Sequence, residues 1–460
     1  MFTTIKNIHF IGIGGIGMSG IAEILLNQGF NVSGSDLAEN ENTLYLENIG
    51  AKVFYGHNPE NVHNAEVVVY SSAVKIDKNP ETLEAKNLGI PLIRRAEMLA
   101  EVTRLNYCIA ISGTHGKTST TSMIGLILIK ANIDPTVIVG GRLKDFGGTN
   151  ARLGKGEWTV VEADEYDRSF LQLLPTIAVV NNIEAEHLDI YKDIDDLLDT
   201  FTKFTEKVPF YGFVALGTDD NGVKEILPRL NKKIVTYGLS RNNDFFAKNI
   251  TAKNNTSEFD LYENGDFQQR IKLKVPGEHN IKNALASITV ARKMGIDYET
   301  ICSALQEFTG VYRRFDIKGE ARGIIVVDDY AHHPSEIKAT LEGARKGWDR
   351  RIVAVFQPHT YTRTLSFYKE FAQSFDEADI LIVTDIYPAR ELPIEGVTGE
   401  LIANQAQKYG HRNVIFIQNF DEIQPKLIEI LLKNDLLITI GAGSIYRIAD
   451  QIFEHLSNKE

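Results

Sequence analysis

A glycine-rich segment in the first third of the chain constrains the fold more than any other feature. Residues 112–118 read Ser-Gly-Thr-His-Gly-Lys-Thr and directly follow the apolar run 107–111. A buried strand, a glycine loop and a helix in this order form a cradle for phosphate, because glycine lets backbone N–H groups approach phosphate oxygens. Lys117 adds a positive charge, and the Thr118 hydroxyl is a possible ligand for Mg²⁺. The segment therefore predicts a strand–loop–helix unit that binds a nucleoside triphosphate.

The loop is shorter than the phosphate loop of kinases and GTPases. In the pattern G-x-x-x-x-G-K-S/T the first glycine would fall at position 111, which is Ile111 here. A generic kinase or GTPase is therefore not our first hypothesis. An ordinary glycine-rich turn is the alternative, but it leaves the strand before the loop and the helix after it unexplained.

Length, charge and cysteine content limit the possible partners. The chain has 460 residues, enough for two or three domains, and its net charge of −12 gives no overall basic field for nucleic acid or an anionic membrane. It contains no apolar run long enough to span a membrane and no signal-peptide pattern. Cys108 and Cys302 lie in apolar runs, as expected of buried, reduced thiols. We expect a cytoplasmic protein, monomeric or weakly homodimeric, with no nucleic-acid or membrane partner.

Strand-like and helix-like runs alternate along the chain, which favours an α/β fold with mostly parallel sheets. Two strand–glycine–helix starts, at residues 8–20 and 108–121, indicate two separate nucleotide-binding units. The polar, alternating region 241–272 reads instead as an antiparallel hairpin without a catalytic role. The predicted domains are 1–104, 105–314 and 315–460.

The N-terminal glycine motif predicts a pyrophosphate site. It follows the strand-like residues 8–11 and matches G-x-G-x-x-G, and Asp36 after a second strand-like run could bind a ribose hydroxyl. Two serines at the end of the apolar run 65–70 would face the same crevice. A dinucleotide and a UDP-sugar both carry a pyrophosphate, and the motif does not separate them. The predicted contacts are Gly12, Gly14, Gly15, Gly17, Asp36, Ser71 and Ser72.

Acidic clusters after two further apolar runs predict metal ligands. Glu162 and its neighbours follow the run 158–161, and the cluster 184–189 follows the run 177–180. Mg²⁺ prefers oxygen ligands and keeps several waters, so one carboxylate with Thr118 and phosphate would suffice. A histidine is an unusual ligand for Mg²⁺, and His187, in the second cluster, is by itself more often a hydrogen-bonding core residue.

Two asparagines at a predicted helix start suggest a purine contact. Asn280 and Asn283 are three residues apart and share a helical face. Their amides can pair with the donor and acceptor edge of a purine. The alternative is that Asn280 caps the helix.

In the last third of the chain, four strand-like runs each end in polar, charged or glycine residues. This is typical of a ligand crevice along the carboxyl ends of parallel strands. His332 and His333 have no cysteine partners, so a zinc site is not expected there. The segments that follow the four runs are 328–335, 357–364, 385–391 and 441–444.

Taken together, these motifs resemble the Mur ligases, and the resemblance runs from Ile8 to Ser444. It implies a Rossmann-like N-terminal domain for a UDP-sugar, a central domain with a P-loop-type ATPase sheet, and a Rossmann-like C-terminal domain. The motifs that carry it are Gly-Ile-Gly-Gly-Ile-Gly-Met-Ser, Gly-Thr-His-Gly-Lys-Thr, Glu-Ala-Asp-Glu, Glu-His-Asn-x-x-Asn-Ala, Asp-Asp-Tyr-Ala-His-His-Pro and Gln-Pro-His-x-Tyr-Thr-Arg-Thr.

The resemblance also implies roles for individual residues. ATP would lie on Gly113, Thr114, His115, Gly116, Lys117, Thr118, His279, Asn280 and Asn283. Mg²⁺ would be bound by Thr118, Glu162 and His187. The amino acid would lie near Tyr330, His359 and Arg363. Catalytic roles would fall to Lys117, His333, His359 and Arg314.

The family reaction implied is the ATP-dependent joining of L-alanine to UDP-N-acetylmuramate in peptidoglycan precursor synthesis. The lactyl carboxylate attacks the γ-phosphorus, which gives an acyl phosphate and ADP, and the alanine amine then displaces phosphate. A base is useful because a free amino acid is mostly protonated at neutral pH. Either His359 or His333 could serve, and the sequence does not choose.

One position departs from the family pattern. The residue after the histidine of Gln-Pro-His is Thr360, where relatives carry arginine, so Arg363 would provide more of the positive charge near the amino-acid carboxylate. Two alternatives stay open. A murein-peptide recycling ligase shares the Glu-Tyr-Asp at 165–167, and an NAD-dependent oxidoreductase would explain only the first glycine motif.

Overall fold

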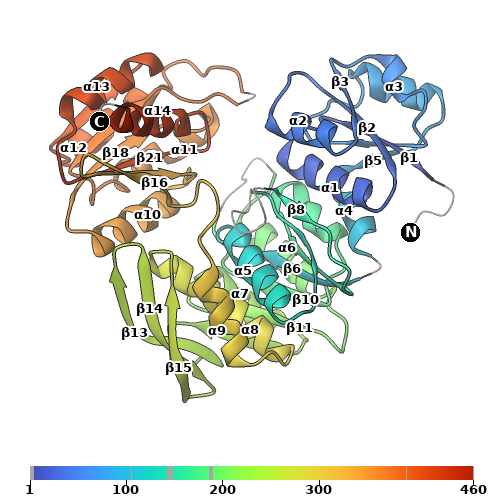
Figure 1. Cartoon of the computed structure of the whole chain (residues 1–460), viewed down its shortest axis with the longest axis horizontal. Helices are drawn as coiled ribbons and strands as arrows, with labels where there is room; N and C mark the ends of the chain where they lie inside the picture. Colours follow the sequence, from blue (N-terminus) through green and yellow to red (C-terminus); the bar gives the residue numbers. More distant parts are fainter. Residues whose placement is uncertain (1–4, 105, 142–148, 186–189, 390, 459–460) are drawn as a thin grey trace. The chain divides into compact units, whose positions relative to one another are not determined.

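The structure, a computed structural model, describes residues 5–104, 106–141, 149–185, 190–389 and 391–458. These residues form three sheets, mainly parallel and each accompanied by helices (Figure 1), so the predicted three-domain α/β architecture is confirmed. Backbone contacts divide the chain into two compact units. One comprises Met1–Lys248, Asp260–Ile271 and Lys282–Phe308, and the other comprises Asn249–Phe259, Lys272–Ile281 and Thr309–Glu460.

The first sheet has five parallel strands in the order β3-β2-β1-β4-β5. The order reverses between β1 and β4, which is the place where open α/β sheets bind ligands. Its strands are β1 (Asn7–Ile11), β2 (Asn31–Asp36), β3 (Lys52–Tyr55), β4 (Val67–Tyr70) and β5 (Leu92–Arg94). Its helices are α1 (Ile16–Asn27), α2 (Glu41–Asn48), η1 (Pro59–Val62), α3 (Pro80–Asn87) and α4 (Arg95–Thr103).

The middle sheet has ten described strands in the order β15-β14-β13-β12-β11-β10-β6-β9-β7-β8. Its strands are β6 (Tyr107–Ser112), β7 (Thr136–Ile138), β8 (Ala151–Arg152), β9 (Trp158–Glu162), β10 (Ile177–Val180), β11 (Phe213–Gly217), β12 (Ile234–Gly238), β13 (Phe245–Lys253), β14 (Thr256–Glu263) and β15 (Asp266–Leu273). Its helices are α5 (Lys117–Lys130), η3 (Tyr166–Gln172), α6 (Ile194–Thr205), α7 (Asn221–Ile226), η4 (Leu227–Arg229), α8 (Glu278–Lys293) and α9 (Tyr298–Glu307). Because β6 lies between β9 and β10, the ends of these three strands are neighbours.

The third sheet has six described strands in the order β16-β17-β21-β18-β19-β20, and β16 is antiparallel to β17. Its strands are β16 (Asp316–Ala321), β17 (Ile324–Asp329), β18 (Arg351–Phe356), β19 (Ile380–Thr384), β20 (Val414–Ile417) and β21 (Asp435–Ile440). Its helices are α10 (Pro334–Gly347), α11 (Tyr361–Ala372), α12 (Gly399–Lys408), η5 (Phe420–Glu422), α13 (Ile423–Ile430) and α14 (Tyr446–Ser457).

The region expected to be a hairpin forms the consecutive neighbours β13, β14 and β15. Two-residue turns connect them, and Asn254, Asn264 and Gly265 adopt positive φ angles of 52°, 51° and 93°. Asparagine and glycine tolerate this left-handed backbone, which matches the twist of a tight hairpin. The sequence signal was the Asn-Gly pair within alternating polar and apolar residues.

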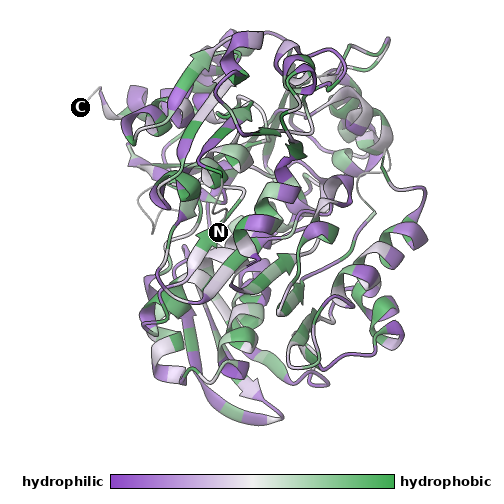
Figure 2. Ribbon diagram, turned by 90° about the vertical axis from the view of Figure 1, so that its right-hand side faces the viewer, coloured by the Kyte–Doolittle hydropathy of each residue, from purple (hydrophilic) through white to green (hydrophobic). Residues whose placement is uncertain are grey.

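The strands at the centre of the middle sheet are buried on both faces. β6, β10 and β11 are apolar and almost wholly buried, as expected for parallel strands covered by helices. Figure 2 shows hydrophobic and hydrophilic residues mixed along the helices, the pattern of helices with one face on a sheet.

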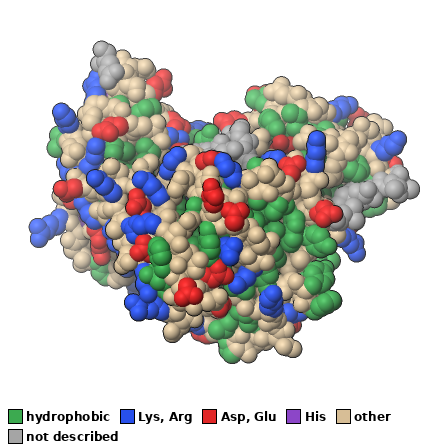
Figure 3. All heavy atoms as spheres, turned by 60° about the horizontal axis from the view of Figure 1, so that its bottom comes forward, with side chains coloured by type: hydrophobic (Ala, Val, Ile, Leu, Met, Phe, Trp, Pro, Cys, Tyr) green, Lys and Arg blue, Asp and Glu red, His purple; other side chains and the backbone are tan. Residues whose placement is uncertain are grey.

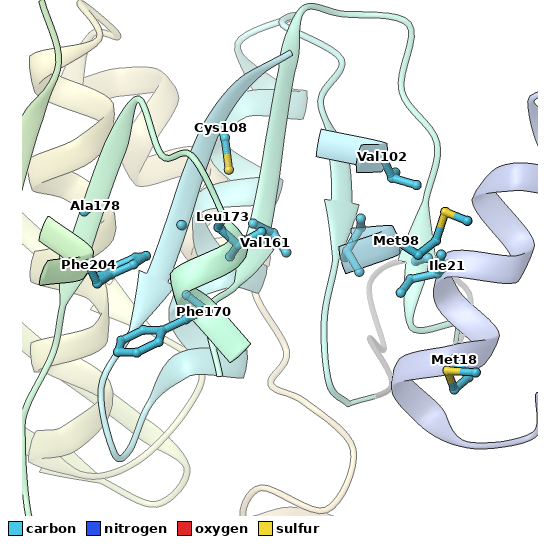
Figure 4. Packing of buried hydrophobic residues seen from close by; sticks show 14 of the residues in the cluster. Met18, Ile21, Met98, Val102, Cys108, Val161, Phe170, Leu173, Ala178 and Phe204 are labelled. Carbon is cyan, nitrogen blue, oxygen red and sulfur yellow. The ribbon is translucent and has the colours of Figure 1, made fainter. Parts of the chain in front are cut away.

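One cluster of buried apolar side chains packs beneath the elements that carry the two glycine loops, including α1 and β6. Figure 4 shows Ile21 of α1 beside Met98 of α4, with Met18 further along α1, and Phe170 of η3 near Phe204 of α6. The rings of Phe170 and Phe204 stack with their centroids 4.7 Å apart. Full burial of one such side chain stabilises the fold by about 1.5–3 kcal/mol. The segments that carry the candidate site therefore rest on a packed core.

The two cysteines differ in burial. Cys108 is buried, whereas Cys302 is only half-buried, so the expectation of buried thiols is correct for the first alone. Burial raises the pKa of Cys108 to about 12 and that of Cys302 to about 11.

Within the described ranges, no helix is long and apolar enough to cross a membrane. In Figure 3, basic and acidic side chains are interspersed on the face shown.

Candidate active site

The second glycine loop connects β6 to α5, as the sequence predicts. Gly113 and Gly116 have φ angles of 129° and 80°, in the region that residues with a side chain avoid. A Cβ atom at Gly113 would lie 3.1 Å from the backbone nitrogens of Asn181 and Asn182, and one at Gly116 would collide with Oδ1 of Asn283. Both positions therefore require glycine. The loop ends at the N-terminus of α5, where free N–H groups favour phosphate.

The segment after β10 fixes the shape of this loop. The backbone N–H groups of His115 and Thr114 donate to Oδ1 and the carbonyl of Asn182, at 2.7 and 3.1 Å. The Asn181 amide donates to the His115 carbonyl, and the Glu184 N–H donates to the Thr114 hydroxyl at 2.9 Å. Sequence reasoning gave Asn181 and Asn182 no role, since only the strand order brings them to the loop.

Lys117 is held by both the loop and a buried carboxylate. Its Nζ donates to the carbonyls of Gly113 and Thr114, at 2.6 and 3.1 Å. It also lies 2.8 and 3.1 Å from the two carboxylate oxygens of Glu165. Glu165 is 2% exposed, and burial, partly offset by Lys117, raises its pKa to about 7. Glu165 was part of a predicted acidic cluster but had no assigned function.

Glu162 and Thr118 fit the predicted cation site. Burial raises the pKa of the Glu162 carboxyl, and a hydrogen bond with the Thr118 hydroxyl opposes this rise. Its Oε1 is buried and has no hydrogen-bond partner among the described residues. A carboxylate oxygen in this state beside a hydroxyl is the kind of donor set that Mg²⁺ takes with phosphate. His187, the third predicted ligand, lies outside the described residues.

Of the three predicted purine contacts, Asn283 lies against the phosphate loop. Its Oδ1 accepts from the Thr120 hydroxyl at 3.3 Å, and it faces Gly116 as described above. Asn280 lies in the first turn of α8 and donates to the Pro276 carbonyl at 2.6 Å instead of capping the helix. The His279 ring lies against Gly277. The purine role of these residues stays a prediction.

The first glycine loop is closed around the end of β2. Gly12 has a φ of 82°, and its N–H donates to the Ser35 carbonyl. Asp36 accepts from the Gly14 N–H at 2.8 Å and from the Leu37 N–H at 2.8 Å. Both carboxylate oxygens of Asp36 therefore already accept a backbone N–H, and Asp36 shapes the loop. A contact from Asp36 to a ribose stays a prediction.

Three more features surround this loop. Ser71 lies beside Gly12 while Ser72 is exposed, and Gly15 is exposed at the loop. The guanidinium of Arg95 lies directly against Gly17 and pairs with Asp164 at 3.7 Å.

A pocket connects the loop to the cation site. It is lined by Gly17, Arg95, Gly140, Glu162 and Asp164, among others. Arg95 was not among the predicted site residues, although a cation directly after the strand-like residues 92–94 is a signal that could have found it.

In the other compact unit, two consecutive arginines pair with different carboxylates, and both lie over the Tyr330 ring, Arg313 at 4.9 Å from its centroid. Arg313 pairs with Asp328 at 3.0 Å and donates to the Gly441 carbonyl at 2.7 Å, which ties the start of this unit to the end of β21. Arg314 pairs with Glu336 at 3.3 Å, and its guanidinium lies 5.3 Å from the Tyr330 ring centroid. Arg314, the predicted catalytic residue, is thus next to Tyr330.

Tyr330, His332 and His359 form a row of rings at the carboxyl edge of the third sheet. The His332 ring lies 5.4 Å from Tyr330 and 6.0 Å from His359, and His359 stacks on Tyr387 at 5.8 Å. Burial, His332 and Arg363 together lower the pKa of His359 to about 4. The structure therefore brings the predicted residues Tyr330, His359 and Arg363 together.

His333 and Thr360 lie beside this row. His333 is buried, with Nδ1 2.8 Å from the Ser335 hydroxyl and its ring against Phe367. Thr360, at the start of α11, has a φ of 65° and a ψ of 147°, a conformation that costs about 1–3 kcal/mol outside glycine. Such strain is concentrated at functional sites.

Three family models match the chain in order. They are "Mur ligase family, catalytic domain" at residues 7–107, "Mur ligase middle domain" at 111–291 and "Mur ligase, glutamate ligase domain" at 313–443. The chain is 52% identical over 456 residues to the UDP-N-acetylmuramate–L-alanine ligase of Geotalea uraniireducens, covering 99% of each.

Two solved structures resemble the whole chain. The UDP-N-acetylmuramate–alanine ligase of Thermotoga maritima superposes with a TM-score of 0.85 at 29% identity, covering 99% of this chain and 100% of that one. The murein peptide ligase of Psychrobacter arcticus gives a TM-score of 0.73 at 26% identity, covering 98% and 99%.

Proposed function

The chain belongs to the Mur ligase family, and from this premise we propose that it joins L-alanine to the lactyl carboxylate of UDP-N-acetylmuramate at the expense of ATP. The observation that carries the proposal is the chain's 52% identity, over 99% of its length, to a UDP-N-acetylmuramate–L-alanine ligase. The reaction belongs to peptidoglycan precursor synthesis. Because ATP and UDP-sugars are cytoplasmic metabolites, we also infer a cytoplasmic location.

The second glycine loop supports ATP as the energy source. The N–H groups at the start of α5 and the ammonium of Lys117 are suited to the β- and γ-phosphates. Thr118 and Glu162, with His187, would hold Mg²⁺, whose charge would offset that of the phosphates. Asn283, next to Gly116, would contribute from α8.

The first glycine loop and the pocket beside it support the place of the UDP-sugar. Arg95 against Gly17 supplies a positive charge where the pyrophosphate would meet the start of α1. From there the pocket leads to Glu162, so the sugar acid would reach the phosphate cradle. The first step brings two anions together, and Lys117 reduces their repulsion, an effect usually worth several kcal/mol.

The row of rings in the third sheet supports the amino-acid site. Arg363 would bind the carboxylate of alanine, and Tyr330 and His359 would border its amine. With its pKa near 4, His359 stays neutral at physiological pH, so it can accept a hydrogen bond from the amine but binds a proton weakly. We therefore assign His359 an orienting role.

The alternatives predict different substrates. The murein-peptide recycling ligase would use a peptide, and the corresponding solved structure is less similar than the alanine ligase. The NAD-dependent oxidoreductase leaves the second glycine loop without a function, and membership of the Mur ligase family speaks against it.

The decisive experiment measures phosphate release from ATP and Mg²⁺ in the presence of UDP-N-acetylmuramate, with and without L-alanine. Release that needs both substrates would support the proposal. Release with a murein tripeptide but not with alanine would assign the chain to peptide recycling instead. No release with either would contradict both ligase assignments.

A further inference from the structure

The ammonium of Lys117 is fully engaged in hydrogen bonds within the protein. An ammonium has three N–H donors, and here two donate to the carbonyls of Gly113 and Thr114. The third is directed to the carboxylate of Glu165, whose two oxygens lie 2.8 and 3.1 Å away. Each donor of Lys117 therefore already has an acceptor. A phosphate that needs this ammonium must replace one of them.

Glu165 is held in place by contacts of its backbone. It is 2% exposed, and its carbonyl accepts from the Tyr191 hydroxyl at 2.6 Å. The Arg168 N–H also donates to that carbonyl, at 3.0 Å, at the start of η3. η3 is anchored by Phe170, which is packed between Phe201 and Phe204. Because Glu165 is buried at the base of this element, Lys117, with its four-carbon side chain, is the partner able to move.

The charges also oppose a site that contains Lys117, Glu165 and phosphate together. In the structure described here the ammonium and the carboxylate neutralise one another in a buried setting. Once Lys117 turns to a phosphate, the Glu165 carboxylate faces added negative charge with less compensation. Even beside Lys117, burial already raises the pKa of Glu165 to about 7, which shows how costly its charge is there.

We propose that Glu165 is a positioning residue that holds Lys117 in the phosphate cradle and competes with nucleotide phosphate for it. The inference rests on the proposed use of ATP. Because of this competition, the wild-type protein binds nucleotide less tightly than its cradle would allow. Glu165 also pairs with Lys117 again when ADP dissociates, and this raises the dissociation rate of ADP.

The test is the affinity for a non-hydrolysable ATP analogue with Mg²⁺, and the dissociation rate of ADP. Glu165→Gln keeps the shape of the side chain and removes its charge. We expect analogue binding to tighten about tenfold and ADP dissociation to slow by a similar factor, with the KM for L-alanine unchanged. A residue with only a structural role would give weaker binding, so unchanged or weaker binding by a folded variant overturns the inference.

Two further variants separate holding from simple repulsion. Glu165→Asp keeps the charge but withdraws the carboxylate by one methylene group, so it also should bind the analogue more tightly than wild type. If it binds like wild type, Glu165 does not act by holding Lys117. In a Lys117→Met background, Glu165→Gln should have a smaller effect, and an effect of full size would also overturn the inference.

The matched control is Asp167→Asn. Asp167 lies two residues away in the same segment, is exposed, and pairs with Arg94 instead of Lys117. This variant should bind the analogue like wild type, and a tightening equal to that of Glu165→Gln would contradict a specific role of Glu165. If wild-type protein binds no analogue at all, it is the proposed function that fails, because the competition would have nothing to act on.

Discussion

Different residues of the phosphate cradle carry out two tasks, shaping the loop and providing charge. Gly113 and Gly116 are needed for their backbone alone, whereas Lys117 and Glu162 would provide charge for the proposed nucleotide and its Mg²⁺. The sequence predicted these four, because their spacing after an apolar run is a local pattern. It could not predict the partner of Lys117, because Glu165 is 48 residues away and reaches it only since β9 is next to β6.

Removing either charged group should abolish turnover. We expect Lys117→Ala and Glu162→Ala each to reduce ADP formation by at least about 100-fold, because Lys117 lowers the repulsion between two anions and Glu162 would hold Mg²⁺. The measurement is coupled detection of ADP with all substrates saturating. Lys130→Ala and Glu157→Ala, at exposed positions on the same domain, should keep wild-type rates. Wild-type turnover by a folded Lys117→Ala protein would contradict the assignment.

Arg363 should act on the amino acid alone. Arg363→Ala is expected to raise the KM for L-alanine about tenfold or more and to change the KM for ATP less than about threefold, because one ionic contact to the alanine carboxylate is lost. Steady-state kinetics with each substrate varied in turn provide the measurement. The control is Lys369→Ala, an exposed cation two turns further along α11. Equal changes in both constants would refute the role.

At the scale of elements, the sequence patterns predicted where strands occur along the chain, but not how the strands pair in the sheets. Apolar runs of four or five residues marked β6 and β17, and the Asn-Gly pair marked the hairpin around Asn264. The patterns did not reveal that β8 runs antiparallel to β7, since two residues carry too little periodicity. They also gave no sign of the asparagines after β10, because pairing between distant strands is not encoded by local hydrophobicity.

The loop before α5 should not tolerate a side chain at Gly116. Gly116→Ala would place a methyl group in left-handed backbone and against the Asn283 side chain. We expect ATP turnover to fall at least about tenfold and stability to fall by about 1–3 kcal/mol. Gly295→Ala has a similar φ of 87° with open space around it, so it should lose stability but keep turnover. Similar turnover in the two variants would contradict the explanation.

The contact between α1 and α2 should make stability depend on pH. Glu23 is 6% exposed, accepts from the Tyr45 hydroxyl, and has a pKa raised by burial to about 7. A neutral Glu23 therefore stabilises the fold below about pH 4.5, and this contribution is lost as the pH rises through 7. Glu23→Gln, which stays neutral, should raise the Tm at pH 8, by the equivalent of about 3 kcal/mol at most, and leave it unchanged near pH 4.5.

Thermal melts at both pH values measure this difference. Glu47→Gln, an exposed glutamate on α2, is the control and should shift neither Tm. An equal rise of the Tm at both pH values would show that Glu23 does not titrate in the transition assigned to it.

At the scale of the whole molecule, a ligand that binds the folded chain and not the unfolded one should raise its thermal stability. A nucleotide at 100 times its Kd stabilises the folded state that binds it by about 2.7 kcal/mol relative to the unfolded chain. We expect a non-hydrolysable ATP analogue with Mg²⁺ to raise the Tm of the wild type in calorimetry. Lys117→Ala should show no rise at the same concentration. A rise of equal size in that variant would mean that the analogue binds elsewhere.

The asparagines that hold the second glycine loop have a consequence for inhibitors. Because hydrogen bonds from Asn181 and Asn182 fix the loop within the fold, its conformational entropy is lost during folding and not upon binding. A small rigid anion shaped to the loop would then gain affinity from each contact without an ordering penalty. Compact phosphate mimics should accordingly show high ligand efficiency here, and resistance would arise most readily after β10, at positions that never touch the drug.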